Sequence, residues 1–357
     1  MIDLRSDTTT LPSMALRECL QHAEVGDDSF GEDKSVNRFQ DYCRELFNVE
    51  EALFVTSGML ANRLAVLSQT SRGDEIATEY GYHINFFDSG ATAALCGVVI
   101  NAKRTQDGIL RVEDIEEMLA SKPRYHVFAQ LKLITLENTI NSRQGQLFPY
   151  EELQRIRTFS KTKGLGIHLD GARLFNAHIA CGIPLAGYAE EVDTLSVCFS
   201  KGLGAPFGSM LMGKKDIIEK AKRFRVWLGS GYHQIGFYAE AAYFALTQQM
   251  ERLKEDHRLT KILAEKISII KELKVDPHNI STNMIFLDTE DLNVSSQDFL
   301  DECSRQGVLL FPWLPTVVRA VIHRDIEEDQ IQKASEVILK VSESFLTKKT
   351  VNQPNET

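Results

Sequence analysis

The hydrophobic positions between residues 50 and 215 form short apolar runs separated by stretches with helical spacing. The apolar runs predict strands at Ala52–Thr56, Leu131–Leu136, Gly166–Leu169, Thr194–Phe199 and Ser209–Met212. The stretches between them include two predicted helices, Leu60–Ser68 and Tyr150–Thr162. Because strands that alternate with helices build parallel sheets, this part of the chain is predicted to be an α/β domain with a mainly parallel sheet.

A further helix is predicted ahead of the first strand. Apolar side chains recur there at helical spacing, at Val36, Phe39, Cys43, Leu46 and Phe47. Ser35 is expected to be the N-cap, because a hydroxyl accepts a hydrogen bond from a free N–H group at a helix start. Asn48 is expected to end the helix.

The pattern changes near residue 250. A long charged helix is predicted at Met250–Leu273, and a final helix from about Ile326 to Phe345. Between these helices the apolar runs predict strands at Met284–Leu287, Val308–Phe311 and Val317–Ile322.

Three segments are therefore expected. Residues 1–250 form a large domain, to whose active site the N-terminal segment contributes, and residues 251–346 form a smaller α+β domain. Residues 347–357 are polar and are expected to be a disordered tail.

Composition narrows the range of functions. Hydrophobic residues make up 43% of the 357 positions and charged residues 25%, which is ordinary for a globular protein. The formal net charge of −10 argues against nucleic acid or an anionic membrane as a partner. The N-terminus has no signal-peptide pattern and no apolar run reaches the length of a membrane helix, so we expect a cytoplasmic protein.

The six cysteines are scattered and form no C-x-x-C pair. This spacing argues against a zinc site or a thioredoxin-like motif, and we expect free thiols and no bound metal.

Ligands of α/β proteins bind beyond the carboxyl ends of the strands, so the residues that follow the predicted strands are the first place to look for chemistry. In Thr56–Asn62, Ser57 and Gly58 separate a strand from a helix. Free N–H groups at such a helix start bind phosphate. The alternative is an ordinary strand–helix turn.

Asp170 ends another apolar strand, and Lys201 follows 31 positions later, about one strand–helix–strand unit. Asp170 either pairs with Arg173 or holds a protonated heterocyclic nitrogen. Lys201 is either a surface lysine or a desolvated nucleophile, for which Gly202 and Gly204 leave room beside a flat ligand.

Three more residues are candidates. His83 and His126 are each either ordinary polar residues or catalytic groups. Arg319 lies in an apolar stretch and needs an anion, for which a substrate carboxylate is one candidate. A phosphate-binding turn, a carboxylate and a lysine in this order are the parts that pyridoxal phosphate requires.

Five motifs now resemble those of the threonine aldolase family of pyridoxal phosphate enzymes. They are "IDLRSDT" from Ile2, "GDDSFGED" from Gly26, "LENT" from Leu136, "HLDGARLFNA" from His168 and "SKGLGAP" from Ser200. The resemblance extends to about residue 345 and implies an aspartate-aminotransferase-like α/β fold.

The resemblance also implies roles for single residues. Lys201 matches the lysine that forms the Schiff base with the cofactor, Asp170 the partner of the pyridine nitrogen, and His83 the histidine stacked on the cofactor ring. His126 matches a histidine near the substrate hydroxyl. The substrate carboxylate is expected at Ser6, Arg173 and Arg319, and the cofactor phosphate at Ser57, Gly58, Met59 and Ser200.

The implied activity is that of a lyase that cleaves threonine or allo-threonine into glycine and acetaldehyde. Met59 stands where the family usually has Thr, Asp88 where Glu is usual and Ile140 where His is common. These differences leave two alternatives open: a relative with another amino-acid substrate or reaction, and a non-catalytic binding protein. The family also implies a homodimer or homotetramer.

Overall fold

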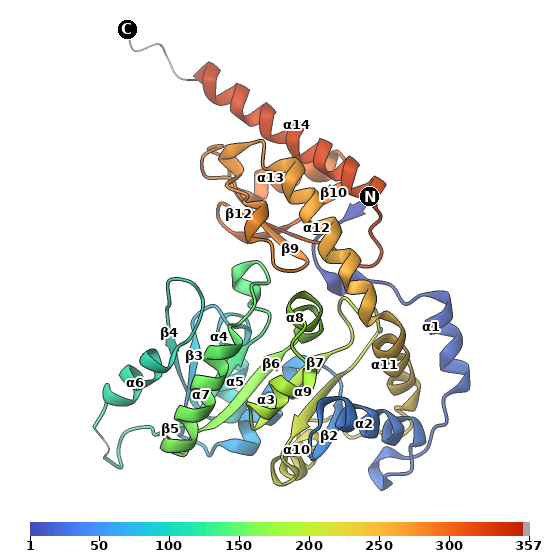
Figure 1. Cartoon of the computed structure of the whole chain (residues 1–357), viewed down its shortest axis with the longest axis vertical. Coiled ribbons are helices and arrows are strands. Elements are labelled where there is room, and N and C mark those ends of the chain that lie inside the picture. The colour runs from blue at the N-terminus through green and yellow to red at the C-terminus, as the bar shows by residue number, and fades with distance from the viewer. Residues whose placement is uncertain (124, 353–357) are drawn as a thin grey trace. The chain divides into compact units, whose positions relative to one another are not determined.

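The structure is a computed structural model that describes residues 1–123 and 125–352. The chain divides into two compact units (Figure 1). Unit 2 comprises Pro12–Met250, and unit 1 comprises Met1–Leu11 together with the chain from Glu251 on. The division at residue 250 lies where the sequence pattern changes, but the first eleven residues group with the C-terminal part rather than with residues 12–250.

Unit 2 is built on a sheet whose seven strands, among the described residues, have the order β2-β8-β7-β6-β5-β3-β4. The strands are β2 (Glu51–Val55), β8 (Ser209–Gly213), β7 (Thr194–Cys198), β6 (Gly166–Gly171), β5 (Leu131–Glu137), β3 (Glu75–Glu79) and β4 (Val99–Lys103). Neighbouring strands are parallel except at β8, which is antiparallel to both β7 and β2. The predicted mainly parallel sheet is confirmed.

Helices cover both faces of this sheet (Figure 1). One face carries α3 (Gly58–Gln69), α5 (Ser89–Cys96) and α10 (Lys215–Trp227), and the other carries α2 (Lys34–Phe47), α7 (Tyr150–Lys163) and α9 (Leu185–Glu190). The strand β2 shows why both faces need cover. Leu53 and Val55 pack with α3 and α10. Phe54 points the other way, and its ring centroid lies 5.9 Å from that of Phe39 in α2.

The remaining helices of unit 2 lie around these layers. They are α1 (Met14–Cys19), α4 (His83–Phe86), α6 (Val112–Ala120), α8 (Leu174–Cys181) and α11 (Gly236–Gln249). Helix α6 packs on α7, and α11 packs on α1 and α2.

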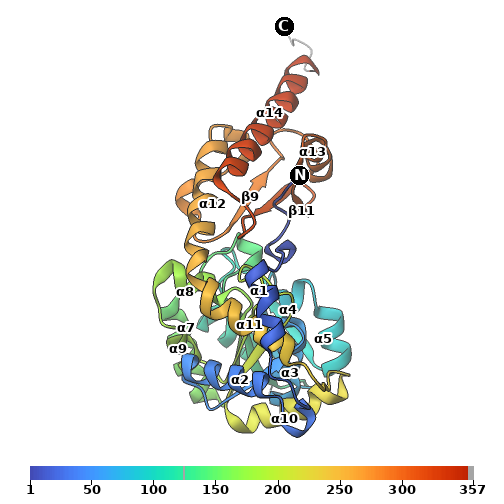
Figure 2. The same cartoon turned by 90° about the vertical axis from the view of Figure 1, so that its right-hand side faces the viewer.

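Unit 1 has its own core around a three-stranded antiparallel sheet of order β11-β12-β9. Its strands are β9 (Met284–Asp288), β11 (Phe311–Leu314) and β12 (Val317–Val321), and β1 (Ile2–Asp3) pairs with β10 (Val308–Leu309) in parallel. Helices α12 (Leu253–Ile267), α13 (Ser296–Arg305) and α14 (Glu328–Asn352) pack on this unit (Figure 2). The predicted tail begins inside α14, and residues 353–357 lie outside the described part of the chain.

The N-cap of α2 differs from the prediction. Asp33, not Ser35, caps the helix, and its Oδ1 accepts the Val36 N–H at 3.1 Å. Asp33 Oδ2 also accepts the N–H of Gly236 at 2.9 Å, so one buried carboxylate joins the start of α2 to the start of α11. Ser35 is instead the second residue of the helix, where its hydroxyl accepts the Glu24 N–H. Asn48 ends α2 in the left-handed conformation, as expected.

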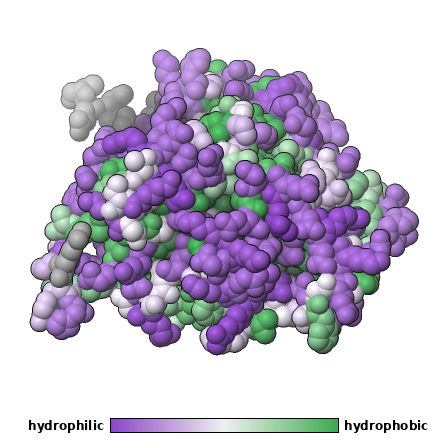
Figure 3. Space-filling view, turned by 60° about the horizontal axis from the view of Figure 1, so that its bottom comes forward, coloured by the Kyte–Doolittle hydropathy of each residue, from purple (hydrophilic) through white to green (hydrophobic). Residues whose placement is uncertain are grey.

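Within the described residues, no helix is both long and apolar enough to cross a bilayer. The face drawn in Figure 3 is largely hydrophilic, with apolar side chains set among the polar ones.

Asp33→Ala should lower the free energy of unfolding by about 2 kcal/mol, because it removes a helix cap and leaves buried N–H groups without an acceptor. Asp41→Ala, on the exposed side of the same helix, removes only an ion pair with Arg44 and should cost less than about 0.5 kcal/mol. Urea unfolding followed by circular dichroism measures both changes, and equal losses would contradict the assignment of the cap.

Candidate functional site

The strand register brings most of the predicted site residues of unit 2 to one edge of the sheet. Asp170 lies beside Glu137 of β5 and Ser196 of β7, and Ser209 lies between Cys198 and Val55. The carboxyl ends of β2, β5, β6 and β7 therefore meet at the edge where β8 begins. The segments that follow these strands carry the residues expected to bind a ligand.

Asp170 is held by a buried chain of hydrogen bonds. Its Oδ2 accepts from Asn62 Nδ2 at 2.6 Å and its Oδ1 from the Ala172 N–H at 3.0 Å. Because Asn62 uses its nitrogen for Asp170, its oxygen must accept, and His168 Nε2 lies 3.0 Å from that oxygen. The sequence did not indicate Asn62, because a polar residue inside a helix is normally exposed.

The chain continues beyond His168. Its Nδ1 lies 2.9 Å from Thr194 Oγ1, which in turn accepts from Gln69 Nε2 at 2.9 Å. The Thr194 hydroxyl thus donates to His168, and the histidine carries its proton on Nε2. Burial lowers the pKa of His168 to about 4, so the ring is neutral. Every donor in the chain points toward Asp170.

His83 is the first residue of α4, which follows β3. Its ring is stacked on Phe87 with 5.1 Å between centroids, and its buried Nδ1 has no hydrogen-bond partner among the described residues. Burial lowers the pKa of His83, the Asp170 carboxylate opposes the shift, and the Lys201 ammonium adds to it. A largely uncharged imidazole with an open nitrogen therefore lies within electrostatic range of Asp170 and Lys201.

Glu137 lies in the same group and was given no role by the sequence, although it belongs to the "LENT" motif. It is buried at the end of β5, and its carboxylate accepts the N–H groups of His83 at 2.5 Å and Asn141 at 2.8 Å. Burial raises the pKa of Glu137, and the neighbouring Asp170 raises it further. Arg173, at the start of α8, is also buried and donates from Nη1 to Asn141 Oδ1 over a long 3.5 Å.

Lys201 follows β7 in a glycine turn. The Gly204 N–H donates to the Lys201 carbonyl at 2.8 Å, and Gly204 has a φ of +75°, which favours glycine. Ser200 precedes the lysine, and its hydroxyl lies 3.3 Å from Cys198 Sγ. The lysine contributes to the pKa shifts of both His83 and Glu137, so its ammonium group belongs to this cluster.

The start of α3 has the features of an anion site. Ser57 is its N-cap and accepts the Leu60 N–H at 3.2 Å. A Cβ at Gly58 would lie 3.8 Å from Ser209 Oγ, and that hydroxyl is buried without a hydrogen-bond partner in the described chain. Met59 is 46% exposed. Helix N–H groups beside an unpaired hydroxyl fit a phosphate oxygen.

Ser6 and Arg319 lie in unit 1, where the structure brings them close together. Arg319 Nη2 donates to the carbonyl oxygen of Arg5 at 3.1 Å, directly before Ser6. The Arg319 guanidinium also lies over the rings of Phe311 and Trp313, at 4.7 and 5.1 Å. These contacts fix a buried arginine next to the Ser6 segment.

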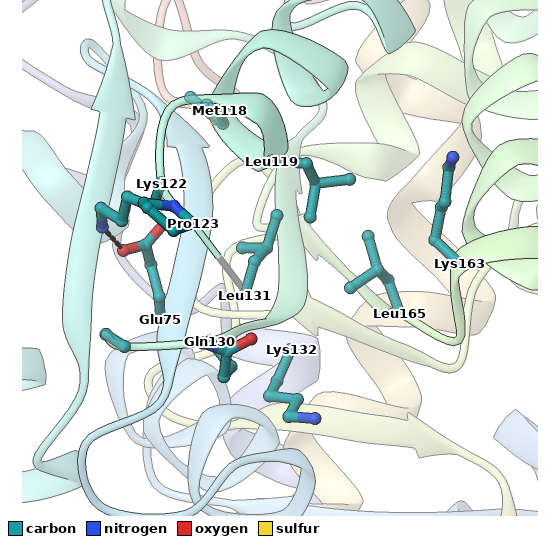
Figure 4. A pocket seen from close by; sticks show the side chains of 11 residues that line it. Glu75, Met118, Leu119, Lys122, Pro123, Gln130, Leu131, Lys132, Lys163 and Leu165 are labelled. Atoms are coloured by element: carbon teal, nitrogen blue, oxygen red, sulfur yellow. Dashed lines mark hydrogen bonds and ion pairs between the residues drawn. The ribbon is translucent and has the colours of Figure 1, made fainter. Parts of the chain in front are cut away.

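His126 does not join the group, contrary to the expectation from the sequence. It is exposed in the segment before β5, whereas Glu137 and Asp170 lie at the other end of the strands. A seven-residue strand separates the two edges by roughly 20 Å. Near the edge where β5 begins, a separate cavity of about 220 Å³ is lined by Leu131, Lys132 and the Glu75–Lys122 ion pair (Figure 4).

Comparisons with known proteins show which family this chain resembles along its length. The chain matches the beta-eliminating lyase family over residues 3–290. It is 36% identical over 333 residues to low-specificity L-threonine aldolase 1 of Arabidopsis thaliana, covering 92% of this chain and 93% of that protein. It is 37% identical over 338 residues to the low specificity L-threonine aldolase of Escherichia coli K12, covering 94% and 97%.

A solved structure of Leishmania major threonine aldolase superposes with a TM-score of 0.83 at 19% identity and covers 96% of this chain and 100% of that one. This likeness confirms the predicted fold. The similar sequences and the five motifs point to the same family. The chain therefore belongs to the beta-eliminating lyase family and, within it, to the threonine aldolase family.

Proposed function

We propose that the protein is a pyridoxal-phosphate-dependent lyase that cleaves threonine and allo-threonine into glycine and acetaldehyde. The observation that carries the proposal is the cluster of Asp170, Lys201 and His83 at one edge of the unit 2 sheet. Relatives named low-specificity L-threonine aldolases, matched over nearly the whole chain, support it.

The residues present fit the cofactor. Lys201 offers an amine for its aldehyde carbon, Asp170 a fixed carboxylate for its ring nitrogen, and the unpaired Ser209 hydroxyl with the start of α3 a place for its phosphate. Ser57, Gly58, Met59 and Ser200 are proposed to surround that phosphate. When bound, pyridoxal phosphate supplies a sink for the electron pair released as the Cα–Cβ bond of the substrate breaks.

The chain's own groups hold the substrate and move its proton. The proposed ligands of the substrate carboxylate are Arg173, Arg319 and Ser6, because charged guanidinium groups bind carboxylates well. His83 is proposed to accept the β-hydroxyl proton, because burial keeps its imidazole uncharged and its Nδ1 is open. The exposed His126 is not needed for this step.

Lys201→Ala tests the function directly. Wild-type protein with pyridoxal phosphate should show a visible absorbance band that changes when L-threonine is added, and it should release acetaldehyde. Lys201→Ala should lose the band and the activity, because no amine remains to hold the cofactor covalently. Lys163→Ala, at the exposed end of α7, is the matched control and should retain both.

The outcomes separate the alternatives. A band that ignores threonine would favour a relative with another amino-acid substrate. The absence of any band in the wild-type protein would contradict the proposal and favour a non-catalytic binding protein.

Asp170→Asn should lower kcat by roughly 100-fold or more, because a neutral amide cannot keep the cofactor nitrogen protonated. The comparison is Asp193→Asn, which removes another buried carboxylate that accepts a backbone N–H, that of Ile167 at 2.8 Å. Asp193 directly precedes β7 and therefore lies at the edge of the sheet opposite to Asp170. If Asp170→Asn and Asp193→Asn lower kcat by the same factor at a temperature where both are folded, Asp170 has no special role in the reaction.

We further propose that the protein is a homodimer or homotetramer, supported by exposed aromatic side chains in unit 2. Phe30 is 79% exposed and Trp227 is 63% exposed. The Phe30 turn is joined to the segment after α10, because the Asp28 N–H donates to the His233 carbonyl at 3.1 Å. Exposed aromatic side chains such as these are enriched at protein–protein interfaces.

Sedimentation velocity should therefore give a mass of about two or four times the 40.3 kDa chain. Trp227→Ser combined with Phe30→Ser should weaken this assembly, whereas Ile269→Ser, at an exposed position of unit 1, should not. A monomeric wild-type protein would contradict the proposal.

A cytoplasmic location is proposed as well, supported by the six free cysteines.

A further inference from the structure

We propose that Glu137 is a positioning residue that holds His83 and Arg173 in place through its two carboxylate oxygens. This inference rests on the proposed function, in which His83 takes a proton and Arg173 binds the substrate carboxylate. Glu137 touches neither substrate nor cofactor in the proposal, so it acts through the two residues that it places.

The contacts of Glu137 are divided between two segments that are distant in sequence. Oε2 accepts the N–H of His83, the first residue of α4, at 2.5 Å. Oε1 accepts the N–H of Asn141, the first residue of the 3₁₀ turn Asn141–Arg143, at 2.8 Å. One carboxylate at the end of β5 therefore fixes the backbone of both segments.

Both segments depend on this outside acceptor. The first N–H groups of a helical turn have no partner within the turn and need an acceptor. The residues in the N-cap positions are Tyr82 and Ile140, and neither makes a side-chain capping bond. Glu137 supplies the acceptor for both turns while it is itself 3% exposed.

The turn Asn141–Arg143 contacts Arg173. Asn141 Oδ1 accepts from Arg173 Nη1, and both side chains are buried. Asp170, the Cα partner of Glu137 in β6, lies three residues before Arg173 in the chain. The position of the guanidinium therefore depends on two segments, the end of β6 that precedes Arg173 and the turn that Glu137 caps.

Glu137→Gln is the sharpest change. It keeps the shape of the side chain but replaces one oxygen by an NH₂ group, which cannot accept a hydrogen bond. Both carboxyl oxygens can accept, whether or not the group is ionised. One of the two backbone N–H groups must therefore face a donor in the variant, and its segment must move.

The matched control is Glu152→Gln. Glu152 is also buried, and its Oε1 accepts the N–H of Val112, the first residue of α6, at 2.9 Å. Its other oxygen pairs with Arg155 at 2.5 Å. Glu152→Gln therefore also leaves one of two donors, the Val112 N–H or the Arg155 guanidinium, facing an NH₂ group, and Glu152 hydrogen-bonds to none of the proposed site residues in the described contacts.

Two quantities should change together in Glu137→Gln. The Kd of glycine, a ligand with the same carboxylate that cannot be cleaved, should rise about tenfold in a spectral titration, and kcat for threonine should fall about tenfold. The Glu152→Gln variant should stay within about twofold of wild type in both, although urea unfolding shows a comparable loss of stability. Asn141→Ala should raise the glycine Kd with a smaller effect on kcat, since it removes the acceptor of Arg173 Nη1 and leaves the bond from the His83 N–H to Glu137 in place.

The inference is overturned if Glu137→Gln behaves like Glu152→Gln in glycine binding and in kcat. If Glu137→Gln does not fold, Asn141→Ala decides, and an unchanged glycine Kd there also overturns it. A wild-type protein that gives no cofactor band refutes the proposed function instead. A wild-type protein that cleaves threonine while the variants match their control refutes only the role of Glu137.

Discussion

The register among the parallel strands β5, β6 and β7 is the constraint on which the site depends. Hydrogen bonding places Glu137 beside Asp170 and Asp170 beside Ser196. A shift by one residue in any of these pairs would turn the side chains to the other face of the sheet. Apolar side chains on both faces oppose such a shift, because every residue of β7 is buried. Packing in the body of the sheet thus fixes the position of chemical groups at its edge.

Much of the fold could be predicted from the sequence, because most strands of unit 2 are short apolar runs. The strands β3 and β4 could not, since polar residues interrupt their patterns. Glu75 and Glu79 begin and end β3 and are both buried. Glu75 accepts from Asn101 at 2.8 Å, and Glu79 accepts the Thr105 N–H at 3.1 Å. These bonds join residues far apart in the chain, and a local pattern does not contain them.

Hydrogen bonds between residues far apart in the chain also limit how much of the site could be predicted from the sequence. Asp170, Lys201 and the Ser57 turn follow recognisable strands, so the topology alone brings them to one edge. Asn62 and Glu137 gain their importance from tertiary hydrogen bonds, which no spacing indicates. His126 received its role from the family resemblance alone, and it lies before β5, at the end of the strand away from Glu137.

The chain of hydrogen bonds from Gln69 through Thr194, His168 and Asn62 to Asp170 has a direction. Reversing it would require the Asn62 amide to flip, the His168 proton to change nitrogen and the Thr194 hydroxyl to rotate, all at once. The dipoles of these neutral side chains therefore add up, with the positive end at the carboxylate. Because Thr194, His168 and Asn62 are buried and uncharged, dissolved salt has little access to this stabilisation. Aligned dipoles of buried neutral side chains thereby help to stabilise the negative charge of Asp170.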